Sequence, residues 1–95
     1  MRHRPRTDSN QTAIVQALRD CGCQVLSLAP MGAGVPDILI GTPKGLILVE
    51  IKDGSKPPSQ RRLTRDEARF HLQWSEHVEV VESVGDALKL IGGRG

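Results

Sequence analysis

Residues 35–52 read Val-Pro-Asp-Ile-Leu-Ile-Gly-Thr-Pro-Lys-Gly-Leu-Ile-Leu-Val-Glu-Ile-Lys, and this stretch decides the fold of the chain. It contains two aliphatic runs, Ile-Leu-Ile and Leu-Ile-Leu-Val, which are separated by Thr-Pro-Lys-Gly. Two apolar runs on either side of a Pro/Gly turn indicate a β-hairpin. The stretch therefore predicts two antiparallel strands at the centre of the fold.

The length of the turn sets which residues of the hairpin face each other. A four-residue loop places Gly41 opposite Leu46, and this register places Asp37 opposite Glu50. A three-residue loop with a bulge at Gly45 is the alternative, and it would put the two carboxylates on opposite faces of the sheet. A site that uses both carboxylates therefore requires the even, four-residue loop or a compensating kink at Pro36.

The charged residues of the hairpin lie at one end of it. Side chains alternate along a strand, so Glu50 and Lys52 share a face, whereas Val49 and Ile51 belong to the apolar face. One interpretation is a strand end that reaches solvent with an ordinary Glu–Lys pair. Carboxylates on so apolar a strand are costly unless a positive charge compensates them. A divalent cation between Asp37 and Glu50 would do so, and Mg²⁺ is usually held by one or two carboxylates.

These residues resemble a known family. Pro36-Asp37 followed by Glu50-Ile51-Lys52 is similar to the PD-(D/E)XK nuclease signature, and the surrounding Gly32, Gly34 and Gly54 resemble its VRR-NUC (virus-type replication-repair nuclease) branch. The resemblance runs from about residue 8 to residue 91. It implies an α/β fold with a restriction-endonuclease-like core, in which a mixed sheet is flanked by helices in the order αβββαβα.

The resemblance also implies a catalytic site. Asp37, Glu50 and Lys52 would be the catalytic residues, and Asp37, Glu50 and the backbone carbonyl of Ile51 would hold Mg²⁺ or Mn²⁺. No organic cofactor is implied. Small members of the family are thought to act as dimers, so a homodimer is expected.

Two helices carry accessory candidates. Many nucleases of this type have a metal-binding Glu on the first helix, whereas this chain has Asn10 and Gln11 in that neighbourhood. Either amide could orient a metal-bound water, although neither replaces a carboxylate charge. On the second helix Glu67 and His71 lie one turn apart, and the family often has Gln at the first of these positions. A structural role for His71 is the alternative.

The distribution of charge points to DNA as the partner. The net charge is only +2, but basic residues gather directly after the carboxylate site, and glycines precede it. The glycines would let the backbone approach a phosphate, or they belong to a plain connecting loop. The predicted DNA-binding residues are Lys56, Arg61, Arg62, Arg65, Arg69, Gly32 and Gly34.

The remaining chain supplies one small domain. We expect a flexible basic arm over 1–7, a VRR-NUC-like nuclease domain over 8–92 and a tail over 93–95. The arm either contacts DNA or is a disordered terminus. Expected elements are helices over 9–21 and 65–74, strands over 24–28 and 78–82, and a final helix after Ser83. Asp8 with Gln11 and Thr64 with Glu67 have the form of capping boxes.

The sequence also predicts which side chains are buried and in which compartment the protein lies. Phe70 and Trp74 are expected in the core, as are Val84, Ala87, Leu88 and Ile91 of the last helix. Cys21 and Cys23 are expected to be reduced and packed, as in a cytoplasmic protein. No apolar run is long enough for a membrane span and no signal peptide is apparent, so we expect a cytoplasmic protein without a membrane partner.

The most concrete function is that of a metal-dependent DNA endonuclease that is selective for junctions or branched DNA in replication, recombination or repair. A non-catalytic DNA-binding or interaction module on a nuclease scaffold is the first alternative, and the missing first-helix Glu favours it. A structural α/β subunit, whose hairpin merely packs, is the second. Fold alone does not separate the three, because function lies in the site.

Overall fold

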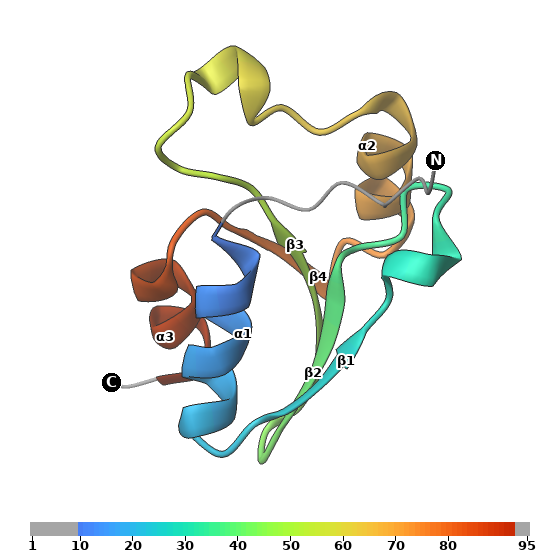
Figure 1. The fold of residues 1–95 in the computed structure, drawn as a ribbon. Coiled ribbons are helices and arrows are strands. Elements are labelled where there is room, and N and C mark those ends of the chain that lie inside the picture. Colours follow the sequence, from blue (N-terminus) through green and yellow to red (C-terminus); the bar gives the residue numbers. More distant parts are fainter. Residues whose placement is uncertain (1–9, 93–95) are drawn as a thin grey trace, which may run out of the picture.

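The computed structural model describes residues 10–92, so the basic arm, the Asp8 capping box and the tail lie outside the described residues. Three α-helices and one four-stranded sheet form the domain (Figure 1). The helices are α1 (Gln11–Asp20), α2 (Arg65–Gln73) and α3 (Val84–Gly92). The strands are β1 (Gln24–Ser27), β2 (Ile38–Thr42), β3 (Gly45–Ile51) and β4 (Val78–Val81), with short 3₁₀ turns at Ala29–Met31 and Pro58–Gln60. The predicted order αβββαβα is confirmed.

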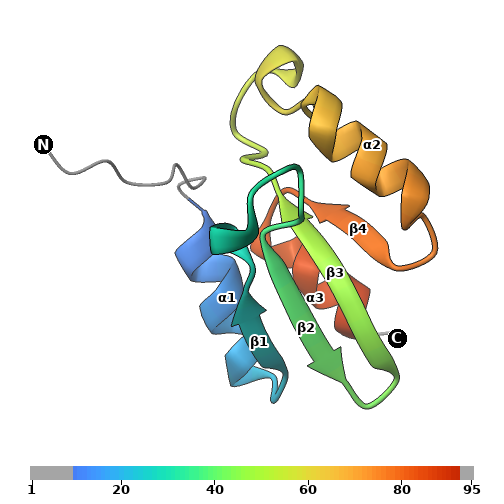
Figure 2. The same ribbon diagram turned by 90° about the vertical axis from the view of Figure 1, so that its right-hand side faces the viewer.

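The sheet is mixed and its strands follow the chain order. β1, β2 and β3 form an antiparallel meander, and β4 joins β3 in parallel after the connection through α2 (Figure 2). Gly41 pairs with Leu46, which is the register that the even loop predicts. Pairing continues to Thr42 and Gly45, so only Pro43 and Lys44 remain in the turn. The bulged alternative is therefore excluded.

The core lies between the sheet and the pair α1/α3, which pack side by side on one face (Figure 1). The alternation of β3 buries Val49 and Ile51 on this face, at 0% and 1% exposure. Ile14 and Leu18 of α1 are wholly buried against them. These two residues are therefore core residues.

The last helix starts as expected, but the face that it buries differs slightly from the predicted one. Asp86 N–H donates to Ser83 Oγ at 3.0 Å, while Asp86 Oδ2 accepts from Glu82 N–H at 2.9 Å. Ala87 is buried, but Leu88 is 37% exposed and Leu90 packs against the core instead. The expected burial of Leu88 is wrong, because the face that meets α1 is shifted toward Leu90.

Helix α2 lies on the other side of the sheet, near its end (Figures 1 and 2). Its capping box is confirmed, because Thr64 and Glu67 each bond the other's backbone N–H. None of residues 65–73 is buried. Trp74 stacks on Phe70 with ring centroids 5.2 Å apart and is 47% exposed, so its expected core position is wrong. The aromatic pair lies beside the sheet, where an apolar hollow is lined by Leu39, Leu46, Leu48, Trp74 and His77.

Both cysteines are free thiols, but only Cys23 is packed; Cys21 is exposed where α1 ends. Within residues 10–92, no helix has the length and apolar character needed to cross a membrane.

Candidate active site

Asp37 and Glu50 meet at the end of the central hairpin. The ladder ends with Ile38 opposite Val49, and one further step in the same register brings Asp37 to Glu50. Asp37 Oδ2 accepts a hydrogen bond from the backbone N–H of Ile51 at 2.7 Å, which holds this carboxylate against β3. The sequence therefore brings its two key carboxylates together, on strands that the core fixes in place.

Glu50 is a buried carboxyl in an electronegative environment. Its side chain is 4% exposed. Burial, followed by repulsion from Asp37 and Glu67, raises its pKa to about 9, although Lys52 acts in the opposite direction. Its Oε1 atom is buried and has no hydrogen-bond partner among residues 10–92. A buried carboxylate oxygen without a partner is costly, so this position suits a cationic ligand.

The backbone carbonyl of Ile51 is a third oxygen group on the side of Asp37. The N–H and C=O groups of a strand residue point toward the same neighbouring strand. Because the Ile51 N–H reaches Asp37, the Ile51 carbonyl is directed to the same side, beyond the last pair of the β2–β3 ladder. Among residues 10–92 no group of three His, Cys, Asp or Glu side chains could hold a metal ion. A cation here would therefore have two carboxylates and a carbonyl from the chain.

Lys52 lies between two carboxylates. Its Nζ is 3.7 Å from Glu50 Oε2 and 2.8 Å from Glu67 Oε1. The same Glu67 oxygen accepts the Thr64 N–H at 2.9 Å. Burial would raise the pKa of Glu67, but the hydrogen bonds from Lys52 and Thr64 outweigh it and hold the pKa below its usual value. Glu67, an accessory candidate from the sequence, is thus brought into the site by its contact with the lysine.

His71 follows Glu67 by one helical turn and is partly buried. Burial lowers its pKa; the nearby Glu67 carboxylate opposes this effect, and Lys52 adds to it. Its Nε2 is buried without a hydrogen-bond partner among residues 10–92. The imidazole therefore belongs to the same electrostatic group as Lys52 and Glu67, whereas its part in the chemistry stays a prediction.

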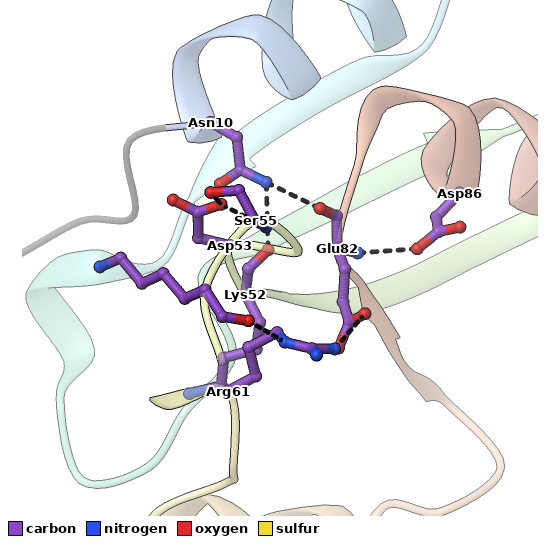
Figure 3. Close-up of polar contacts among 8 residues, drawn as sticks. Asn10, Lys52, Asp53, Ser55, Arg61, Glu82 and Asp86 are labelled. Atoms are coloured by element: carbon purple, nitrogen blue, oxygen red, sulfur yellow. Dashed lines mark hydrogen bonds and ion pairs between the residues drawn. The ribbon is translucent and has the colours of Figure 1, made fainter. Parts of the chain in front are cut away.

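Asn10 and Gln11 occupy different positions. Asn10 Nδ2 donates to the carbonyls of Lys52 and Glu82, at 3.0 and 3.1 Å, and so ties the start of α1 to the ends of β3 and β4 (Figure 3). Gln11 lines a hollow with Val25 and Ser27, on the α1 side of β1. Each has a buried side-chain oxygen without a partner among residues 10–92. Asn10 therefore lies beside the backbone of Lys52. The roles of Asn10 and Gln11 toward a metal-bound water stay predictions.

The loop after β3 is folded rather than extended. Arg61 Nη1 contacts both carboxylate oxygens of Glu82, at 3.0 and 3.2 Å, and its Nε donates to the Lys56 carbonyl at 2.7 Å (Figure 3). Asp53, which the sequence analysis did not single out, is buried and accepts from Ser55 N and Oγ. Arg61 is therefore engaged within the chain. The other predicted basic residues are exposed: Lys56, Arg62, Arg65 and Arg69.

The two glycines before the hairpin differ from each other. Gly34 has φ +81°, and a Cβ on it would lie 2.5 Å from the backbone carbonyl of Asp66 in α2. Gly32 has φ +61° and open space around it. Close packing against α2 therefore accounts for Gly34, whereas only Gly32 is open to a ligand on the side where a Cβ would point.

Together, the mixed sheet, the carboxylate pair at the hairpin end and the adjacent lysine define a domain with the PD-(D/E)XK nuclease fold. The chain matches no family sequence profile and no curated protein. It is similar to a solved "VRR_NUC domain" with a TM-score of 0.63 and 25% sequence identity, over 90% of this chain and 98% of that one. The fold of this chain is thus similar to that of a VRR-NUC domain, which is the family that its motifs resemble.

Proposed function

We propose that the chain is a metal-dependent DNA endonuclease that hydrolyses phosphodiester bonds. The observation that carries this proposal is the buried, unpartnered Oε1 of Glu50 beside Asp37. A structural carboxyl at a strand end would reach solvent or find a donor within the fold. A carboxyl group that is shielded from water and lies beside a second carboxyl group suits a site that binds a divalent cation.

Asp37, Glu50 and the Ile51 carbonyl would hold Mg²⁺ or Mn²⁺. When bound, the ion would supply Lewis-acid polarisation of the phosphate and lower the pKa of a coordinated water. Asp37 would be kept in place for this role by its hydrogen bond from Ile51 N–H. Asn10, Gln11 and His71 are proposed only as accessory groups at the border of the site.

Lys52 would stabilise negative charge on the phosphate and orient the attacking water. Its ammonium lies 3.7 Å from Glu50, on the same side of β3 as the proposed metal site. Two unlike charges about 4 Å apart interact by about 4 kcal/mol at an effective dielectric of 20. The exposed Arg62, Arg65 and Arg69 would contact DNA phosphates, together with Lys56 and the Gly32 backbone.

The proposed substrate is junction or branched DNA in replication, recombination or repair. One copy carries one site and so cuts one strand, whereas a junction needs two coordinated cuts. A twofold homodimer of the domain over 8–92 would supply them. The proposed contact is the edge strand β1, on which Leu26 is 61% exposed, because Ile14 and Leu18 of α1 are buried in the core.

The test is cleavage of junction, flap, nicked and plain duplex DNA by purified protein with Mg²⁺, Mn²⁺ or EDTA. We expect metal-dependent cleavage that favours a branched substrate and that Asp37→Ala abolishes. The competing proposal is a non-catalytic DNA-binding module, which the two-carboxylate donor set favours. Binding of junction DNA without cleavage under any of these metals would establish that alternative.

A further inference from the structure

The tightest contact of the Lys52 ammonium is with Glu67 rather than with Glu50. The distances are 2.8 Å to Glu67 Oε1 and 3.7 Å to Glu50 Oε2. Both partners of the shorter contact are mostly shielded, with 12% and 18% of their side chains exposed. A charge-assisted hydrogen bond in such surroundings is shorter and stronger than a neutral one, so it constrains the flexible lysine side chain.

Glu67 is itself held in place by the backbone. Its Oε1 accepts the Thr64 N–H at 2.9 Å, and its own N–H donates to Thr64 Oγ1 at 3.2 Å. This reciprocal capping box fixes the carboxylate relative to the first turn of α2. The loop that contains Gly32 and Gly34 contacts the same turn of α2, because Gly34 packs directly on the Asp66 backbone. The position of the carboxylate is therefore set by two independent backbone contacts.

A direct role as a third metal ligand does not suit Glu67. Its Oε1 already receives hydrogen bonds from Lys52 and Thr64. Asp37, Glu50 and Glu67 also do not form a group of three that could hold a metal ion among residues 10–92. The geometry instead directs this carboxylate at the lysine.

We propose that Glu67 is a positioning residue, which holds the Lys52 ammonium beside Glu50 so that it meets the phosphate in the reactive arrangement. This inference rests on the proposed function. In it, α2 contributes to catalysis through the polar link from its capping box to the end of β3. The helix, none of whose residues is buried, thereby acts as a support for the site.

Glu67→Gln separates this role from a structural one. Glutamine serves equally well in a capping box, so the helix start is kept while the charge that holds the ammonium is lost. Because misplacement of a reacting group by about 1 Å costs on the order of 100-fold, we expect kcat to fall about 10- to 100-fold. The KM for junction DNA should stay unchanged, because Glu67 does not contact the substrate. Glu76→Gln, at an exposed position away from the site, is the matched control and should behave as wild type.

A second measurement does not depend on cleavage. Reductive methylation of metal-free protein, read by mass spectrometry, compares labelling of Lys52 with labelling of the exposed Lys44 and Lys89. We expect Lys52 to be labelled several-fold faster in Glu67→Gln than in wild type, with the reference lysines unchanged and the melting temperature retained.

The two measurements keep this proposal distinct from the nuclease proposal. Wild-type kcat and unchanged Lys52 labelling in Glu67→Gln would overturn the positioning role, as would a change in KM alone. If wild-type protein cleaves no DNA, the nuclease proposal fails, and the labelling result alone decides. Faster labelling then still supports the Glu67–Lys52 link, and unchanged labelling overturns it.

Discussion

The carboxylate of Asp37 accepts the backbone N–H of Ile51 at 2.7 Å, where the β2–β3 ladder would otherwise end. One side chain thereby replaces a ladder hydrogen bond and is fixed beside Glu50. The bond places a strand-end aspartate at the proposed metal site without any contribution from a helix. Asp37 thus has both a structural and a proposed catalytic role, and substitution can separate them.

Asp37→Asn should abolish cleavage while leaving the metal-free fold as stable as wild type or slightly more stable. The amide oxygen can still accept the Ile51 N–H, and the Asp37 charge that disfavours ionisation of Glu50 is removed. Thermal melts in EDTA measure this, with Asp20→Asn at an exposed position of α1 as the control. Clear destabilisation by Asp37→Asn alone would mean that the aspartate serves the fold.

The stability of the metal-free domain should fall as the pH rises from about 4.5 to about 9. The pKa of Glu50 is raised from 4.5 to about 9 in the folded protein, mainly by burial. A carboxyl with a raised folded pKa contributes stability that is fully present below the unfolded pKa. That stability is lost as the pH rises through the folded value, by at most about 1.4 kcal/mol per pH unit.

Glu50→Gln tests this sign, because glutamine cannot ionise. Urea unfolding in EDTA at several pH values should give a shallower pH dependence for Glu50→Gln and a more stable fold than wild type at pH 8. Equal pH slopes for the two proteins would contradict the assignment of the effect to Glu50.

Gly34→Ala should destabilise the domain more than Gly32→Ala does. Both glycines have positive φ, so each substitution carries a backbone penalty of about 1–2 kcal/mol. Only at Gly34 does the new methyl group meet the Asp66 backbone, at 2.5 Å, which forces α2 away from the loop. We expect an additional cost of about 1–3 kcal/mol there, measured by urea unfolding. Equal costs would mean that the loop and α2 adjust to each other freely.

Arg61 and Arg62 should affect DNA binding differently. Arg62 is exposed, so Arg62→Gln should reduce the slope of log affinity against log salt by about one. Arg61 is paired with Glu82, so Arg61→Gln should lower the melting temperature and leave this slope nearly unchanged. Fluorescence anisotropy with junction DNA at several salt concentrations distinguishes them. A full unit of slope lost at Arg61 would show that it leaves Glu82 to contact phosphate.

The protein should be a dimer at micromolar concentration, and Leu26→Glu on the edge strand β1 should convert it to a monomer. Leu72→Glu, on the exposed side of α2, is the control and should remain dimeric. Sedimentation equilibrium with and without junction DNA measures this. A wild-type monomer under both conditions would remove the paired-cut proposal and leave a nicking enzyme or a binding module.

The sequence by itself determined the hairpin, its register and the capping box of α2. Alternation along β3 assigns Glu50 and Val49 to opposite faces, and an even turn leaves only one register that joins Asp37 to Glu50. The Thr64–Glu67 pair is similarly local, since its donors and acceptors lie within one helical turn. These features depend on neighbouring residues alone, so a pattern can encode them.

The tertiary structure alone decided what covers each face and which partner each charge takes. Helical periodicity placed Phe70 and Trp74 on one face, but it could not show that this face lies beside the sheet and leaves Trp74 exposed. Arg61 and Arg62 belong to the same basic run of the sequence, yet Arg61 forms an ion pair with Glu82 after β4, whereas Arg62 is exposed. The Lys52–Glu67 contact joins residues of two elements packed at the sheet end. Such pairings follow from how the elements pack in three dimensions, which local sequence patterns do not specify.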